Sequence, residues 1–178
     1  TLVRLWVDGQ RELETVSAQN SQAARRLLQY GALCCDGSVV YKEDGTEQHI
    51  GDPTETSILV AAHKNGMEQE ELNRQYPRLA ELPFDSDRKL MTSVNQIDGK
   101  IVAIVKGAFD VMAARCVSGD LEAAKEKNDE MSRGALRVLA VGYKVLDKAP
   151  ENPASQELEN GLTLMGLVGM IDPPRPEA

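Results

Sequence analysis

The stretch between Pro83 and Asp110, PFDSDRKLMTSVNQIDGKIVAIVKGAFD, places an aromatic ring and two lysines around a tight turn. Phe84 is one of only two phenylalanines in the chain and stands in the polar segment LPFDSDRK, five residues before Lys89. A flat ring beside cationic groups can stack on a base while the cations contact phosphates. The alternative for Phe84 is an ordinary core position at the entrance of a strand.

The dipeptide Asp98-Gly99 lies between two strand-like runs and predicts a two-residue hairpin turn. That turn pairs Ile97 with Lys100, and it therefore places Lys106 opposite Met91. In this register Lys89 and Lys106 are diagonal neighbours on one face, with about 7 to 8 Å between their attachment points. The other face, which is the one expected to be buried more deeply, collects the residues Leu90, Val94, Ile101, Ala103 and Val105.

Two lysines so close together repel each other, which indicates a shared anionic partner. The alternative is that both are solvated surface side chains that splay apart, since exposed charges are common and weakly constrained. The residues of the hairpin alone leave both interpretations open.

The composition limits the classes of function. The chain has 178 residues, a formal net charge of −8 and no apolar run longer than about half of a membrane helix, so we expect one soluble globular domain. The negative charge argues against a nucleic-acid partner, although a local group of basic residues can still bind a small anion. Three cysteines without a CxxC spacing give no reason to expect a disulfide framework or a metal site.

The elements that must position the hairpin alternate between helical and strand-like patterns. Strands are expected within 1–10, on both sides of Asp98-Gly99, within 135–146 and within 162–172, and helices within 17–35, 51–66, 67–76, 108–116 and 121–134. The segment 36–52 reads as a turn-rich loop, and it lacks the ligands of a calcium loop because Val40 and Tyr41 occupy two required positions. Helices arranged around hairpin-linked strands predict an α+β fold with a mainly antiparallel sheet.

Four separated stretches, taken in order, carry a family resemblance: GDPTET at 51–56, PFDSDRKLM at 83–91, VKGA at 105–108 and LRVLAVGYK at 136–144, with MIDPPRPEA at the end of the chain. Together they resemble the nucleotide-binding domain of P-type cation-transporting ATPases, in the calcium-pump-like branch and with bacterial-like short spacing. The resemblance covers nearly the whole chain. It implies residues 1–168 as the nucleotide-binding domain and 169–178 as a hinge into the phosphorylation domain.

The resemblance also implies roles for single residues. Glu55 matches the acid at the adenine end of the pocket, Phe84 the ring that stacks on adenine, and Arg137 the arginine that reaches toward the polyphosphate. The remaining matches are the two pocket lysines Lys89 and Lys106, the small wall residues Gly107 and Ala108, the apolar contact Leu139, and the hinge residues Asp172 and Arg175. Ser86 stands where animal calcium pumps often carry an arginine, so that a phosphate contact there is missing or is supplied by Arg88.

The resemblance implies ATP as ligand, with Mg²⁺ accompanying the nucleotide in the intact protein. It implies a cytoplasmic domain of an integral membrane ATPase, in which this domain presents the γ-phosphate to an aspartate of the phosphorylation domain. The partners are then the phosphorylation and actuator domains of the same polypeptide and a cation, expected to be calcium, held in membrane helices. The motif D-K-T-G-T of that aspartate does not occur here, so no catalytic residue and no metal ligand is assigned to this chain.

Two other classes of function stay open at this point. One is a stand-alone module that senses adenine nucleotides, and the other is an acidic protein-interaction domain whose lysines are solvated. The first would bind ATP, whereas the second would ignore nucleotides.

Overall fold

The computed structural model describes residues 2–35, 37–51, 53–85, 87, 89–148 and 158–171, without the side chains of residues 53 and 54. These residues form one eight-stranded sheet, a separate two-stranded sheet and five helices. The expected α+β fold with a mainly antiparallel sheet flanked by helices is confirmed.

The large sheet has the strand order β2-β1-β10-β9-β7-β6-β5, and β8 pairs with β10. Every pair along this path is antiparallel, and the contact of β8 with β10 is parallel. The strands are β1 (Leu2–Val7), β2 (Glu14–Thr15), β5 (Arg78–Asp85), β6 (Leu90–Ile97), β7 (Lys100–Ala108), β8 (Cys116–Ser118), β9 (Arg137–Leu146) and β10 (Leu162–Met170). Strands β3 (Ser38–Tyr41) and β4 (Glu47–Ile50) form the two-stranded sheet.

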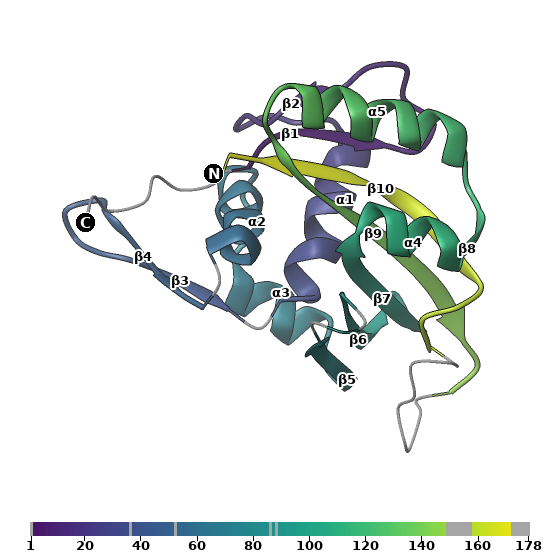
Figure 1. Ribbon diagram of the computed structural model, residues 1–178. Helices are drawn as coiled ribbons and strands as arrows, with labels where there is room; N and C mark the ends of the chain where they lie inside the picture. The colour runs from purple at the N-terminus through teal and green to yellow at the C-terminus, as the bar shows by residue number, and fades with distance from the viewer. Residues whose placement is uncertain are drawn as a thin grey trace.

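The helices cover the two faces of the large sheet and make a three-layered domain (Figure 1). Helices α1 (Gln22–Leu33), α2 (Pro53–Lys64) and α3 (Gln69–Gln75) pack on one face, and α4 (Phe109–Arg115) and α5 (Leu121–Arg133) pack on the other. The side chains of neighbouring residues in one strand therefore pack into two different hydrophobic cores, one on each face of the sheet. On β7, for example, Ile104 packs with α1 and α2, whereas Val105 packs with α4 and α5.

The β6–β7 hairpin has the predicted register. Asp98 and Gly99 both have positive φ values, 51° and 80°, as a type I′ turn requires. Ile97 pairs with Lys100 and Met91 pairs with Lys106, as the turn predicts.

The face opposite Lys106 is buried as predicted, with Leu90, Val94 and Val105 each 0% exposed, but the Lys106 face is buried as well. Met91 and Ile104, on the Lys106 face, are 2% and 0% exposed, because α1 packs against this part of the sheet. The two central strands are thus buried on both faces, and a period-two pattern cannot tell such faces apart.

Some elements differ from the sequence-based expectation. The segment read as a turn-rich loop forms the β3–β4 hairpin, and β2, β5 and β8 were not predicted as strands. The helix expected within 17–35 spans Gln22–Leu33. The polar segment LPFDSDRK overlaps the end of β5, whose residues alternate between exposed and half-buried positions at the edge of the sheet.

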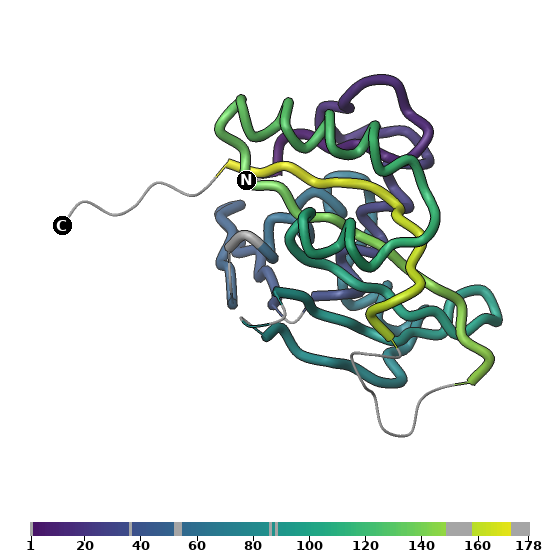
Figure 2. The backbone as a smooth tube through the Cα atoms, turned by 45° about the vertical axis from the view of Figure 1, so that its right-hand side comes forward, coloured from purple at the N-terminus to yellow at the C-terminus, as the bar shows by residue number. Residues whose placement is uncertain are grey.

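Figure 2 shows β10, in yellow, beside the start of the chain. Leu2 of β1 pairs with Met170 of β10, which joins the first and last described strands near one edge of the sheet. Within the described residues, no helix is both long and apolar enough to cross a membrane. The division at residue 168 stays a prediction, because the expected hinge residues Asp172 and Arg175 lie outside the described part of the chain.

Candidate functional site

A pocket of about 460 Å³ opens at one end of the large sheet, and we call it the sheet-edge pocket. Its volume falls in the range of about 300 to 1,000 Å³ that is usual for small-molecule sites. It is lined by Glu55, Phe84, Lys89, Met91, Lys106, Gly107, Ala108, Arg137, Val138 and Leu139. All eight residues for which the sequence predicts a binding role and which the structure describes are among them.

Antiparallel pairing brings these residues together. Phe84 lies near the end of β5, Met91 near the start of β6, Lys106 near the end of β7 and Arg137 at the start of β9. Because neighbouring strands run in opposite directions, these ends meet at the same edge of the sheet. Glu55 reaches the pocket from the first turn of α2.

Lys106 is held inside the wall of the pocket. Its side chain is 5% exposed, and its Nζ lies 3.1 Å from Oε1 of Glu55, whose side chain is 19% exposed. The same Nζ donates a short hydrogen bond to the backbone carbonyl of Cys34, at the C-terminal end of α1. The interpretation of Lys106 as a solvated lysine was therefore wrong.

The Lys106 ammonium stays charged in spite of its burial. Burial by itself lowers the pKa of a lysine, but the negative charges that Cys35, Cys34 and Glu55 carry when ionised hold the pKa of Lys106 above its ordinary value. Burial raises the pKa of the Cys34 thiol and brings the pKa of the Cys35 thiol to about 12. Both thiols are therefore neutral at pH 7, and Glu55 is the negative charge that matters to Lys106 there.

Phe84 and Lys89 form the open side of the pocket. Phe84 is 61% exposed, which excludes the alternative of a core position and leaves its ring accessible to a ligand. Lys89 is exposed and comes directly before β6. Its φ of 60° is uncommon for a residue other than glycine. Lys89 is thus solvated, as one interpretation held, and it also lines the pocket.

Gly107 allows the chain around Lys89 to approach β7. A Cβ atom at position 107 would lie 2.3 Å from the carbonyl oxygen of Lys89 and 2.6 Å from Cδ2 of Leu90. The absent side chain therefore lets Lys89 and Leu90 pack directly on β7, which helps to place Lys89 at the pocket.

The charge of the pocket is opposite to that of the whole molecule. Lys89, Lys106 and Arg137 supply three cationic side chains and Glu55 the one carboxylate of the lining, although the chain carries a net charge of −8. A cavity lined by one sign of charge concentrates the field locally, so the acidic surface does not prevent an anion from binding here.

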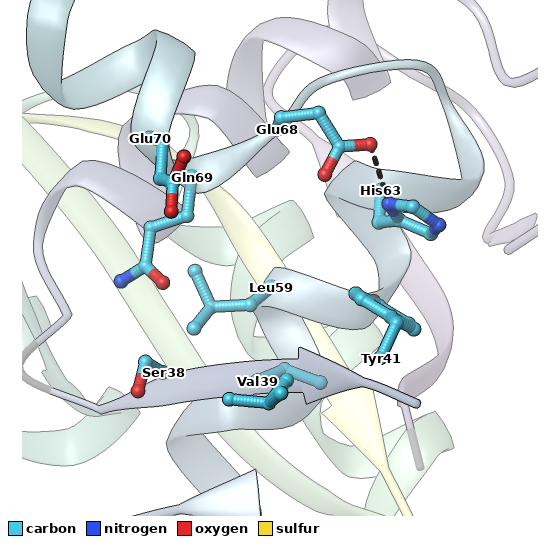
Figure 3. Close-up of a pocket in the computed structure, with 9 residues that line it drawn as sticks. Ser38, Val39, Tyr41, Leu59, His63, Glu68, Gln69 and Glu70 are labelled. Atoms are coloured by element: carbon cyan, nitrogen blue, oxygen red, sulfur yellow. Dashed lines mark ion pairs between the residues drawn. The ribbon is translucent and has the colours of Figure 1, made fainter. Parts of the chain in front are cut away.

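A second pocket of about 460 Å³, the hairpin pocket, lies between the β3–β4 hairpin and helices α2 and α3 (Figure 3). His63 pairs with Glu68 at 2.6 Å, and the ring of Tyr41 stacks on that of His63 with the centroids 4.1 Å apart. Its lining includes two glutamates and neither lysine nor arginine. Volume does not separate the two pockets, but a phosphate would be repelled here and attracted at the sheet-edge pocket.

Sequence reasoning did not identify every residue of the site. Met91 could have been found from its register position opposite Lys106, whereas Val138 carried no signal. The carbonyl of Cys34 could not be found, because it is a backbone group brought in from 72 residues away. Arg88, which was expected to supply a phosphate contact if that contact is not missing, lies outside the described residues, as does Ser86.

The sheet, the helices on both faces and the pocket at the strand ends define an α+β domain with a pocket whose charge favours anions. The chain matches the family described as "P-type ATPase, cytoplasmic domain N" over residues 23–177 and belongs to that family.

Its relatives include P-type pumps of several bacteria. The chain is 38% identical to a calcium-transporting ATPase of Listeria monocytogenes over 181 aligned residues, which cover 94% of this chain and 20% of the relative. It is 39% identical to a calcium-transporting ATPase of Bacillus subtilis, with 91% and 19% covered, and 37% identical to a cation-transporting ATPase of Synechocystis, with 83% and 17% covered. The chain thus spans about a fifth of the length of these relatives.

Proposed function

We propose that this chain binds ATP in the sheet-edge pocket and serves as the nucleotide-binding domain of a cation-transporting P-type ATPase. The observation that carries the proposal is the convergence of eight predicted residues on one pocket, from one helix and three strands and from the connection between β5 and β6. Two relatives named as calcium-transporting support calcium as the transported ion.

The pocket offers a separate group for each part of the nucleotide. The exposed ring of Phe84 provides a stacking surface for adenine, and the Glu55 carboxylate can accept a hydrogen bond from the exocyclic amine. The cationic side chains of Lys89 and Arg137 are available to the phosphates through charge-assisted hydrogen bonds. Mg²⁺ would accompany the phosphates, and no residue of this chain is assigned to it.

In the intact pump, the domain would hold the γ-phosphate toward an aspartate of the neighbouring phosphorylation domain. Phosphoryl transfer depends mainly on positioning and on neutralisation of charge, so a domain without a nucleophile can still contribute to the rate. The actuator and phosphorylation domains would then be the partners of this one, and ATP hydrolysis would be coupled to cation translocation by the whole protein.

The Phe84→Ala variant tests the proposal by isothermal titration calorimetry with ATP. Stacking on an aromatic side chain contributes about 1 to 3 kcal/mol per base. The Kd of the variant should therefore rise by about 5- to 150-fold. The free energy of unfolding should change by less than about 0.5 kcal/mol, because the ring is exposed.

Tyr41→Ala is the matched control, since it removes an aromatic ring from the hairpin pocket. It should leave the Kd for ATP unchanged. Equal affinities of the parent and the Phe84→Ala variant would contradict the assignment of the ring, and a folded parent that ignores ATP would contradict the proposed function.

A further inference from the structure

The C-terminal end of α1 lies behind the wall of the sheet-edge pocket and is held by two cations. Nη2 of Arg78, at the start of β5, donates to the carbonyl oxygens of Leu33 at 2.7 Å and of Cys35 at 3.1 Å. The carbonyl between these two belongs to Cys34 and accepts from Nζ of Lys106. Three consecutive carbonyls are thus bound by side chains that come from two different strands.

The chemistry of a helix end explains this arrangement. The last carbonyls of a helix have no partner within the helix, and they form the negative end of its dipole. Helix α1 has no basic residue in its own last turn, so the positive charges come from the sheet. Arg78 lies opposite Asn95, whereas Lys106 lies opposite Met91, so the two side chains approach the turn from positions four residues apart along β6.

We propose that Arg78 is a positioning residue for Lys106, although it is not part of the pocket lining. By holding the peptide groups on both sides of the Cys34 carbonyl, Arg78 fixes the acceptor that places Nζ of Lys106 beside Glu55. The inference rests on the proposed function, because Lys106 and Glu55 line the pocket that is assigned there to ATP.

A plain charge effect of Arg78 on Lys106 would have the opposite sign. Two like charges repel, so removal of Arg78 by itself would make the Lys106 ammonium easier to keep in its buried place. Loss of a well-placed carbonyl acceptor would instead leave the ammonium less firmly held. The behaviour of the ammonium protons therefore separates positioning from electrostatics.

The test compares the parent with Arg78→Gln and Arg78→Lys, and with Arg74→Gln as the matched control. Arg74 carries the same charge on the exposed surface of α3, where it pairs with Glu71. The first readout is the rate of proton exchange of the Lys106 ammonium with water, measured by ¹⁵N NMR without nucleotide at constant pH and low temperature. The second is the Kd for ATP.

In the Arg78→Gln variant the ammonium protons should exchange about five- to tenfold faster than in the parent, and ATP should bind about three- to tenfold more weakly. Arg78→Lys should lie between the two, with about a two- to threefold faster exchange. One ammonium can replace the single Nη2 that contacts both carbonyls, but it loses the contact of Nη1 with Glu81. Arg74→Gln should match the parent in both readouts.

Unchanged or slower exchange in a folded Arg78→Gln protein would overturn the inference, and a change of the same size in Arg74→Gln would overturn it as well. If Arg78→Gln does not fold, Arg78→Lys decides, because exchange identical to that of the parent contradicts a positioning role. If the parent and Arg78→Gln bind ATP equally well, the inference about Arg78 is refuted, but the proposed function is not. A parent that does not bind ATP refutes the proposed function, and the role of Arg78 in it.

Discussion

Lys106 carries a positive charge that is almost completely removed from water, and this burial decides what the side chain can do. Its ammonium is committed to Glu55 and to the carbonyl of Cys34. The more accessible cations of the pocket, Lys89 and Arg137, are therefore better placed to move with a ligand. The pair of Lys106 and Glu55 acts as a fixed wall against which a ligand can be oriented.

Replacement of Lys106 by methionine should destabilise the domain as well as weaken ATP binding. The change leaves the carboxylate of Glu55 and the Cys34 carbonyl without their shared cation. Removal of one partner of a buried ion pair costs about 3 to 5 kcal/mol. Because Glu55 keeps some exposure, we expect a loss near 3 kcal/mol in the free energy of unfolding, measured with urea.

The double variant Lys106→Met with Glu55→Gln provides the control for that prediction. It also removes the carboxylate charge that has lost its contact with Lys106, and it should recover part of the lost stability. If Glu55→Gln lowers the free energy of unfolding of Lys106→Met by as much as it lowers that of the parent, the two residues are not energetically coupled.

The lack of space for a Cβ atom at Gly107 leads to a steric prediction. An alanine there would bring Cβ to 2.3 Å from a backbone oxygen, and backbone cannot yield as a flexible side chain does. Gly107→Ala should lower the free energy of unfolding by about 1 to 3 kcal/mol and weaken ATP binding through displacement of Lys89. Gly99→Ala, at a position open to solvent, tests only the turn and should leave the Kd unchanged.

Among the elements, α1 links the site to the rest of the domain. Its C-terminal end holds Lys106, and its N-terminal end is fixed by Glu14 of β2. The Glu14 carboxylate accepts from the backbone N–H of Ser21 at 2.9 Å, from its hydroxyl at 2.6 Å and from Nδ2 of Asn20 at 2.7 Å. Ser21 is the N-cap residue of α1, and its hydroxyl also accepts from the N–H of Ala24.

These contacts predict a pH dependence of stability. Burial by itself would raise the pKa of Glu14, but the hydrogen bonds from Ser21, Asn20 and Gln10 outweigh it and lower the pKa below its ordinary value of 4.5. A carboxylate with a lowered pKa stabilises the fold above the pKa of the unfolded chain, and this contribution is lost as the pH falls through the folded value. The effect lies below about pH 5.

Glu14→Gln should therefore lower the free energy of unfolding by about 1 kcal/mol at pH 7, the usual value of a hydrogen bond where solvent screens the charge. The loss of stability between pH 5 and 3 should be shallower than in the parent. Urea unfolding at several pH values measures both effects. An identical pH dependence of the two proteins would show that Glu14 does not anchor the helix.

The elements also show how far the sequence could predict the structure. The turn at Asp98-Gly99 sets the pairing of Met91 with Lys106, because hairpin register follows from local turn geometry. The contacts of Arg78 with α1 join residues 43 to 45 positions apart, and no local pattern encodes such a contact. Burial of both sheet faces was missed for the same reason, since it depends on where α1 docks.

For the whole molecule, the distribution of charge matters more than its sum. The lining of the sheet-edge pocket has more cationic than acidic side chains, although the chain as a whole is acidic. The lining of the hairpin pocket has acidic side chains and neither lysine nor arginine, in keeping with the net charge of the chain. The candidate residues of the sheet-edge pocket could be predicted because four ordered motifs pointed to a family, and antiparallel strand ends then had to bring them together. The chemical difference between the two pockets could be established only from the three-dimensional structure.

The most direct test of the central claim is an NMR titration of the chain with ATP, and then with GTP, that follows the backbone amides of both pockets. We predict saturable shifts at Glu55, Phe84, Lys106 and Arg137, a preference for ATP over GTP, and no shift at Tyr41. Shifts confined to the hairpin pocket, or none in a sample shown to be folded, would contradict the assignment of the sheet-edge pocket to ATP.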